Sequence, residues 1–178
     1  MTETASVYGS ALYDLAREQQ QEEQYLSQTL LIRQLLQENP EFLRLLGARS
    51  VPLEERRQVV ERCFGTLLPE VKNYLKLLCD RNAIRQLPDC LRQFELCYNR
   101  DHGILEVTAT SAVSLTPPQA EALQKKLEAR TGKSVRLRFA VDPAVLGGMR
   151  LSMEGQELDG TLRRRLEVLS GELRQLTL

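Results

Sequence analysis

Apolar residues recur every three or four positions through roughly the first hundred residues, which is the period of an α-helix with one buried face. Breaks fall at residues 38–40, at residues 47–52 and at Leu68-Pro69, while Pro88 stands where the first turn of a helix tolerates proline. We predict five or six short helices and assign residues 1–103 to an N-terminal six-helix bundle. The stripes behind this prediction are Tyr8, Ala11, Leu12 and Leu15; Val60, Cys63, Phe64 and Leu67; Val71, Tyr74, Leu75 and Leu78; and Ile84, Leu87, Leu91, Phe94 and Tyr98.

Beyond residue 103 the apolar residues alternate, as they do in a strand that buries one face. This pattern covers residues 104–112 and 135–141, and a shorter run at 149–155 gives a third strand. The buried face would carry Leu105, Val107 and Ala109 on the first strand, and Val135, Leu137, Phe139 and Val141 on the second.

Two further helices are predicted, one between the strands and one after them. The first begins at Thr116 as N-cap, with Pro117 at the first helical position and Gln119 at the third, which completes a capping box. The second begins near Asp159. Residues 104–178 then make a small β-α-β-β-α domain, and the chain is of the α+β class. Leucines follow a heptad spacing along the last helix, at Leu162, Leu166, Leu169, Leu173 and Leu176.

Composition and charge narrow the possible classes of function. Lys+Arg and Asp+Glu number 24 each among 178 residues, and this zero net charge argues against a general nucleic-acid binder. The opening residues lack the basic and apolar regions of a secretory signal, and no apolar run is long enough to span a bilayer. We therefore expect a soluble chain without direct membrane insertion, and membership of a membrane-bound assembly stays open.

The four cysteines do not suggest a metal centre. They contain no C-x-x-C pair, and His102 is the only histidine, so the spacing is too open for a zinc site. All four fall on apolar faces of predicted helices, at Cys63, Cys79, Cys90 and Cys97. We expect buried free thiols, as in a reducing compartment, and no bound metal.

Residues 130–141, RTGKSVRLRFAV, contain what looks like the end of a phosphate-binding loop. Gly132, Lys133 and Ser134 fit the last positions of G-x-x-x-x-G-K-[ST], but Leu127 stands where the first glycine belongs. The segment also runs from a predicted helix into a predicted strand, so a phosphate would meet the negative end of the helix dipole. We interpret Gly132 as the left-handed residue that ends a helix, and we predict no cofactor.

Other polar groups do not compose an active site either. Asp142 precedes a proline and Asp159 precedes a predicted helix, so a turn and a cap explain them. Residues 163–165 are three consecutive arginines, which fan around a helix and favour a solvated face. We expect His102 to be an exposed loop histidine. We predict that the protein is not an enzyme.

One helix carries more apolar surface than a bundle requires. Between residues 69 and 82, Val71, Leu75 and Leu78 form one compact face, and Tyr74 and Leu77 widen it by roughly another 100°. Such a helix either lies at the centre of its bundle or offers a flank to a partner helix. The pattern alone leaves both interpretations open.

Several stretches together resemble the delta subunit of bacterial and plastid F-type ATP synthases, equivalent to the mitochondrial oligomycin-sensitivity-conferring protein. VYGSALYDLA at 7–16 is similar to the opening helix of that family, and NYLKLLCDRNAIRQLP at 73–88 is similar to its fifth helix. VDPAVLGGMRL at 141–151 and LDGTLRRRLEVL at 158–169 resemble its C-terminal half. The resemblance covers nearly the whole chain, and the C-terminal stretch is its most specific part.

The resemblance implies a mechanical role, in which the protein joins the catalytic head of the synthase to the b-subunit stalk. The complex would lie on the cytoplasmic face of a bacterial inner membrane or on a thylakoid membrane. In that family the N-terminal helix of an alpha subunit binds between the first and fifth helices. The implied contact residues are Tyr8, Ala11, Leu12, Leu15, Tyr74, Leu77 and Leu78, and for the C-termini of the b subunits Leu162, Leu166 and Leu169.

Two alternatives stay open at this point. One is a free-standing adaptor that binds RNA or a partner helix. Zero net charge counts against RNA binding, whereas a steep dependence of RNA affinity on salt concentration would support it. The other is a small NTPase that uses residues 131–134, which loss of nucleotide binding in Lys133→Ala would support.

Overall fold

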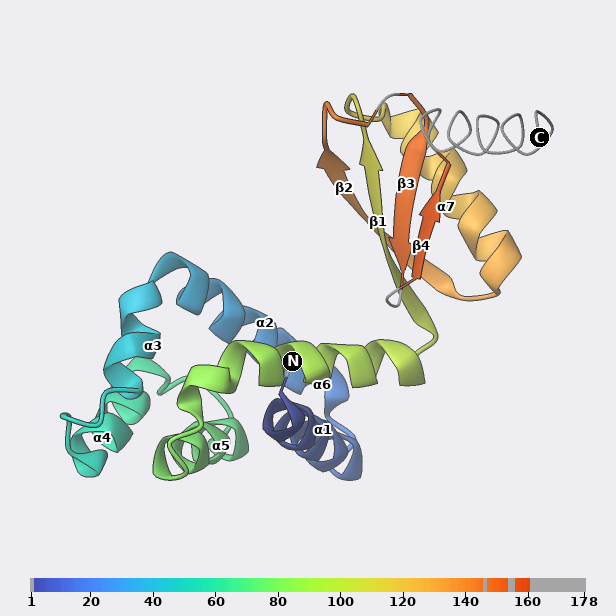
Figure 1. The fold of residues 1–178 in the computed structure, drawn as a ribbon. Helices are drawn as coiled ribbons and strands as arrows, with labels where there is room; N and C mark the ends of the chain where they lie inside the picture. Colours follow the sequence, from blue (N-terminus) through green and yellow to red (C-terminus); the bar gives the residue numbers. More distant parts are fainter. Residues whose placement is uncertain (1, 146, 154–155, 161–178) are drawn as a thin grey trace, which may run out of the picture. The chain divides into compact units, whose positions relative to one another are not determined.

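A computed structural model of the chain describes residues 2–145, 147–153 and 156–160. It divides into two compact units, Met1–Tyr98 and Asn99–Leu178, and the last helix of the first unit runs on to Asp101. The first unit is built from helices and the second around a four-stranded sheet, which confirms the α+β class (Figure 1). None of the described helices combines the length and the apolar character that crossing a bilayer would require.

Six α-helices and one 3-10 turn make up the helical part of residues 2–101. Prolines open two of them, Pro40 in α3 and Pro69 in α5, where a missing backbone N–H costs nothing. Thr2 caps α1, because its hydroxyl accepts from the N–H of Ala5. The elements are α1 (Glu3–Glu18), α2 (Glu22–Glu38), α3 (Pro40–Leu46), α4 (Leu53–Cys63), α5 (Pro69–Asp80), η1 (Ile84–Gln86) and α6 (Leu87–Asp101).

The core of the first unit draws on all of these elements. Helix α1 approaches α6 closely, because a Cβ on Gly9 would lie only 2.4 Å from the carbonyl oxygen of Cys90. One turn further along α1, the rings of Tyr13 and Phe94 meet edge to face with centroids 5.6 Å apart. A buried carboxylate, Glu95 of α6, pairs with Arg33 of α2.

The second unit contains a sheet of order β2-β1-β3-β4, with β1 and β2 parallel and the other pairs antiparallel. Helix α7 makes the crossover between the two parallel strands, and the capping box predicted at its start is present. A small core of Leu105, Val107, Leu127 and Val135 lies between helix and sheet. The bounds are β1 (Ile104–Ser111), α7 (Pro117–Thr131), β2 (Ser134–Val141), β3 (Met149–Met153) and β4 (Gln156–Asp159).

Three predictions from the pattern need correction. The strand β4 was not predicted, and Asp159 ends it. The helix predicted to follow lies outside the described residues. Cys63 is exposed, unlike the other three thiols, because α4 ends at this residue and the helical period stops with it. On β2, Val135 is buried but Phe139 and Val141 are about half exposed, at 50% and 54%, so the described part of the chain covers only one end of that face.

Candidate functional site

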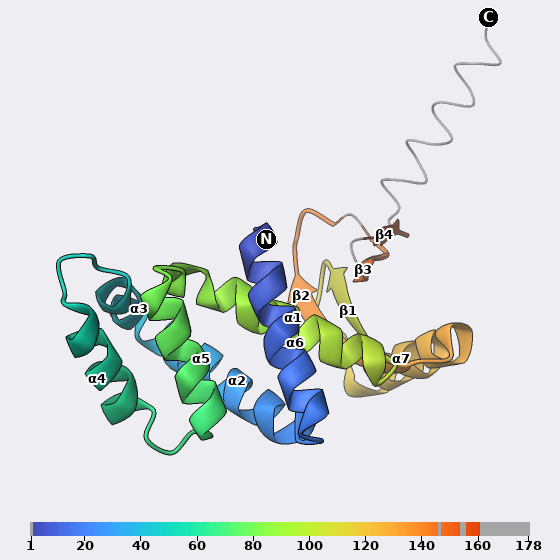
Figure 2. The same cartoon turned by 90° about the horizontal axis from the view of Figure 1, so that it is seen from below.

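Helices α1 and α5 lie side by side (Figure 2). A shallow apolar groove runs between them. Its volume is about 440 Å³. The lining combines six of the seven residues that the resemblance implied with three others, and only two of the nine side chains are polar. They are Val7, Tyr8, Ala11, Leu12, Leu15, Glu70, Asn73, Tyr74 and Leu77.

The groove residues differ in how much surface they offer. Leu77 is 41% exposed and Val7 62% exposed, whereas Tyr74 is 8% exposed and forms the floor. Leu78 is fully buried and does not line the groove, so its place is in the core of the bundle. Both interpretations of the broad apolar face of α5 therefore apply to part of it. Leu78 packs in the core of the bundle, and Leu77 lies on a flank that is open to a partner.

The groove is open because α1 turns a different stripe toward the core. The buried residues of α1 include Ala5, Gly9, Leu12 and Ala16, which follow one another at helical spacing. Three of these are small, so α1 can lie close against its neighbours without filling the space beside it. The larger side chains of Tyr8 and Leu15 consequently stay half-buried at the surface.

The floor of the groove contains a polar atom in an apolar setting. The hydroxyl oxygen of Tyr74 is fully buried, and the neighbouring Cys90 thiol does not satisfy hydrogen-bond geometry with it. Burial, with smaller contributions from Cys90 and Tyr8, raises the pKa of Tyr74 far above its ordinary value. Tyr74 therefore stays neutral, and the groove floor carries no charge.

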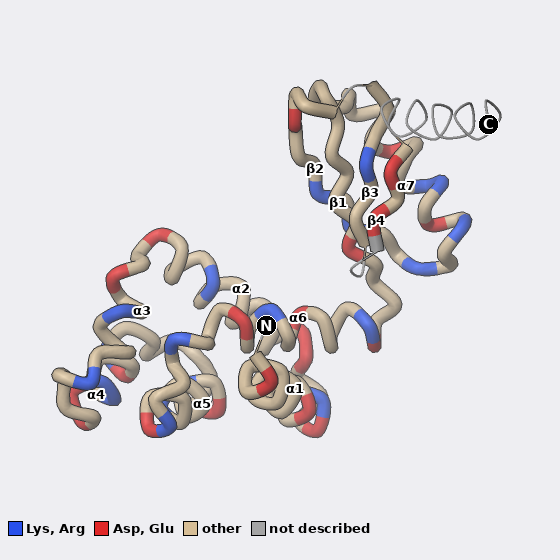
Figure 3. The backbone as a smooth tube through the Cα atoms, viewed as in Figure 1, with Lys and Arg blue, Asp and Glu red and all other residues tan. Residues whose placement is uncertain are grey.

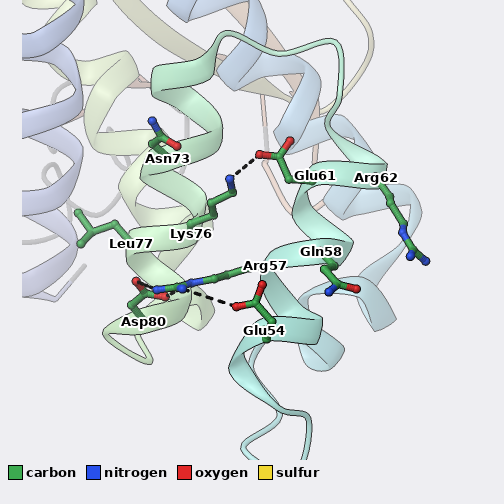
Figure 4. Close-up of a pocket in the computed structure, with 9 residues that line it drawn as sticks. All are labelled: Glu54, Arg57, Gln58, Glu61, Arg62, Asn73, Lys76, Leu77 and Asp80. Carbon is green, nitrogen blue, oxygen red and sulfur yellow. Dashed lines mark hydrogen bonds and ion pairs between the residues drawn. The ribbon is translucent and has the colours of Figure 1, made fainter.

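A second and larger cleft, of about 580 Å³, lies between α4 and α5 and is lined mainly by charged side chains (Figure 4). Four of these charged residues form two pairs that join the two helices. Arg57 of α4 grips Asp80 of α5 with two hydrogen bonds of 3.0 and 2.6 Å. Lys72 and Lys76 of α5 both reach Glu61 of α4. Figure 3 shows the same interspersion of acidic and basic positions along both helices.

These carboxylates are poor candidates for acid–base chemistry. The hydrogen bond from Arg57 holds the pKa of Asp80 below its usual range, and those from Lys76 and Lys72 do the same for Glu61. Both groups therefore stay ionised near neutral pH and serve as ties between helices. A general acid or base would need a pKa shifted toward neutrality, and neither carboxylate has one.

The segment that resembles a phosphate-binding loop is a helix end. Gly132 adopts φ = 66° after α7, and its N–H donates to the carbonyl oxygen of Glu128 at 2.8 Å. The prediction of a left-handed glycine cap is thus confirmed. Lys133 and Ser134 lead straight into β2, so the loop lacks the following helix that a phosphate cradle requires. In the same unit, Asp142 accepts from the N–H of Ala144, as a turn residue does.

The structure brings Tyr8, Ala11, Leu12, Leu15, Tyr74 and Leu77 together in one groove. Resemblance supplied these residues, whereas Val7, Glu70 and Asn73 were missed. A helical-spacing argument could have found Val7 and Asn73, since each precedes a groove residue by four positions, Ala11 and Leu77 respectively. The candidate b-subunit contacts Leu162, Leu166 and Leu169 lie outside the described residues.

Comparisons with known proteins agree on one family. The model of the ATP synthase delta (OSCP) subunit family matches residues 4–173. ATP synthase subunit delta of Moorella thermoacetica is 29% identical over 168 residues, covering 94% of both chains. That of a Geobacillus species is 30% identical over 170 residues, covering 95% of this chain and 96% of the other.

A solved structure shares the fold. It is a chain in the cryo-EM structure of the Toxoplasma gondii mitochondrial ATP synthase hexamer, with a TM-score of 0.77 at 21% identity. The likeness covers 97% of this chain and 98% of that one. The chain belongs to the ATP synthase delta (OSCP) subunit family and is a non-catalytic component of the peripheral stalk of an F-type ATP synthase.

Proposed function

We propose that the α1/α5 groove receives the N-terminal helix of an alpha subunit and so attaches this protein to the catalytic head. The observation that carries the proposal is the groove itself. Two helices that could have closed on each other instead leave an apolar trough, with Leu77 and Val7 exposed along its edges. An amphipathic helix lying in such a trough buries its apolar face and leaves its polar face in water.

The available surface suits an attachment of moderate strength. Full burial of a Leu, Val or Tyr side chain contributes about 1.5–3 kcal/mol, and the half-exposed groove residues would gain roughly half of that each. Four such residues give about 3–6 kcal/mol on this side of the interface, with a comparable gain from the incoming helix. Association itself costs on the order of 4–15 kcal/mol, so binding at this one groove would be reversible.

A second attachment through the C-terminal region would complete the stator. We assign it to the C-termini of the b subunits and to Leu162, Leu166 and Leu169 of this chain. Their heptad spacing suits contact with another helix. Two attachments on one chain raise the effective concentration at each site, which suits a part that resists torque. The assembled protein would lie on the cytoplasmic face of a bacterial inner membrane, or on a thylakoid membrane.

Two leucines of similar exposure test the groove. Leu77→Asp places a charge in the trough, whereas Leu31→Asp places one on α2, outside the groove residues, where Leu31 is 44% exposed against 41% for Leu77. We expect Leu77→Asp to weaken binding of a synthetic alpha-subunit N-terminal peptide at least about tenfold, and Leu31→Asp to leave the affinity unchanged. Calorimetry measures both, with circular dichroism as the check on folding. Equal affinities of the two variants for the peptide would show that the peptide does not bind in the groove.

A further inference from the structure

We infer that the groove accepts its helix in one direction only, with the helix N-terminus beside Glu18 and Glu70 and its C-terminus beside Arg81. The inference rests on the proposed function and adds the polarity of the bound helix. It follows from how charges are distributed at the two ends of the groove.

The two ends of the groove are fixed by the antiparallel run of α1 and α5 (Figure 2). The hydroxyl of Tyr25 donates to Gln19, just after the end of α1, at 2.7 Å. Burial raises the pKa of Tyr25, and the nearby negative charge of Glu70 raises it further. The start of α5 therefore lies near the end of α1, while Tyr8 and Tyr74 neighbour each other further along the groove.

The end of the groove near Gln19 is acidic on both sides. Glu70 lines the groove directly from the first turn of α5. Glu18 follows Leu15 by three positions and Ala11 by seven, so it continues the groove face of α1. Neither carboxylate has an ion-pair partner among the residues that the structure describes. Asp14, on the flank of α1, adds to the same end.

The opposite end of the groove carries a cation. Arg81 caps α5 and follows Leu77 by four positions and Tyr74 by seven, so it continues the groove face of α5. The other charges of α5 are engaged on its far side, where Lys72 pairs with Glu61. Figure 4 shows the pairs of Lys76 with Glu61 and of Asp80 with Arg57 on the same side.

This arrangement leaves Glu70 and Arg81 as the α5 charges that can act on a groove occupant. On α1, Glu3 precedes Val7 by four positions and offsets part of the Arg81 charge. The acidic end, with Glu18, Glu70 and Asp14, therefore contributes most of the asymmetry.

A helix carries about half a positive charge at its N-terminus and half a negative charge at its C-terminus. If the occupant is the very start of a polypeptide, its α-amino group adds a further positive charge at the N-terminal end. Both contributions favour the same direction. The bound helix would run parallel to α5 and antiparallel to α1.

Disulfide trapping tests the direction of the bound helix. In a Cys63→Ser background the remaining thiols are buried, so a single new cysteine reports on its own end of the groove. Thr66→Cys lies in the turn that leads into α5, whose first turn carries Glu70 at the acidic end, and Thr4→Cys lies four positions before Tyr8 within α1 at the other end. The probe is a synthetic alpha-subunit N-terminal peptide with one cysteine at its N-terminus, and a second version with the cysteine at its C-terminus.

We expect the N-terminal thiol to couple with Thr66→Cys and the C-terminal thiol with Thr4→Cys. The reverse preference, or equal yields, would overturn the inferred direction while leaving the groove assignment intact. A peptide that binds without coupling at either end would place the occupant elsewhere and overturn the proposed function as well.

Charge variants test the cause of the direction. Glu18→Gln, Glu70→Gln and Arg81→Gln should each weaken peptide binding about two- to fivefold at low salt, and the differences should shrink at high salt. Glu55→Gln is the matched control, because Glu55 is also an acid in the first turn of a helix but belongs to α4, away from the groove. Tighter binding by Glu70→Gln, or a loss in Glu55→Gln as large as in Glu70→Gln, would contradict the electrostatic account.

Discussion

Single residues decide how closely the helices approach, and Gly9 is the clearest case. A methyl group at this position would lie 2.4 Å from the Cys90 carbonyl oxygen and 2.6 Å from the Cβ of Gln93, both on α6. Neither atom can move without shifting the α6 backbone. The close contact of α1 and α6 therefore depends on the absence of a side chain at residue 9, and so does the orientation that exposes Tyr8 and Leu15.

Gly9→Ala should consequently lower the free energy of unfolding by about 1–3 kcal/mol, the usual cost of overpacking a core. Urea denaturation followed by circular dichroism measures the loss. Gly65→Ala is the control, because a methyl group there would meet only the Glu61 carbonyl oxygen at an ordinary 3.4 Å. An alanine at residue 9 that is as well tolerated as one at residue 65 would show that α1 does not lie against α6 as described.

The Arg57–Asp80 pair gives a prediction with a defined pH dependence. Because Arg57 depresses the pKa of Asp80 in the folded state, the pair stabilises the fold above the unfolded-state pKa of about 4. That stabilisation is lost as pH falls through the folded-state pKa. Asp80→Asn should therefore lower the urea midpoint slightly at pH 7 and match the unmodified protein in strong acid. A difference between the two proteins that grows on acidification would have the wrong sign.

At the scale of elements, the capping box at the start of α7 contributes to the stability of the second unit. The hydroxyl of Thr116 accepts from the backbone N–H of Gln119, and the backbone N–H of Thr116 donates to the side chain of Gln119 at 3.0 Å. Thr116→Ala should cost about 1 kcal/mol of stability, the typical value for a lost N-cap. Thermal melting measures it, with Thr116→Ser as the control that retains the hydroxyl. Equal melting temperatures for the alanine and serine variants would mean that the cap contributes nothing.

Elements with strong local signals could be predicted from the sequence, and α7 with its cap and its final glycine is the best example. Periodicity predicted the buried face less well where one helix carries two apolar stripes. On α1 the stripe of Tyr8, Ala11, Leu12 and Leu15 was predicted as a core face, yet only Leu12 of these is buried, together with Ala5, Gly9 and Ala16. Small residues carry little hydrophobic signal, although they allow the closest packing.

Sheet edges were the other difficulty. The strand β4 spans only four residues, Gln156–Asp159, and its partner β3 supplies the hydrogen bonds that define it. Short edge strands depend on tertiary pairing more than on their own sequence, so the polar pattern around Asp159 was assigned to a helix start. The groove, in contrast, was predictable as a set of residues only through family resemblance, because no local pattern specifies which two helices become neighbours.

At the scale of the whole molecule, the groove is one of two proposed attachments, and this changes what a groove variant should do in the assembled synthase. A chain already held by the b subunits presents its groove to the alpha-subunit helix at an effective concentration of about 1 mM. A tenfold weaker groove would then remain largely occupied. The effect of Leu77→Asp in the complex should accordingly be much smaller than its effect on binding of the isolated peptide.

Two single variants and their combination test this prediction in membranes that contain the complete synthase. Leu77→Asp alone and Leu166→Asp alone should each leave the subunit bound through the other attachment, with ATP-driven proton pumping largely retained. The double variant should be released by washing and should uncouple pumping from hydrolysis, because neither tether is left to supply the effective concentration. Complete release of the subunit by Leu77→Asp alone would show that the groove is the sole attachment. A double variant no worse than Leu77→Asp alone would remove the leucine stripe of the C-terminal segment from the b-subunit contact.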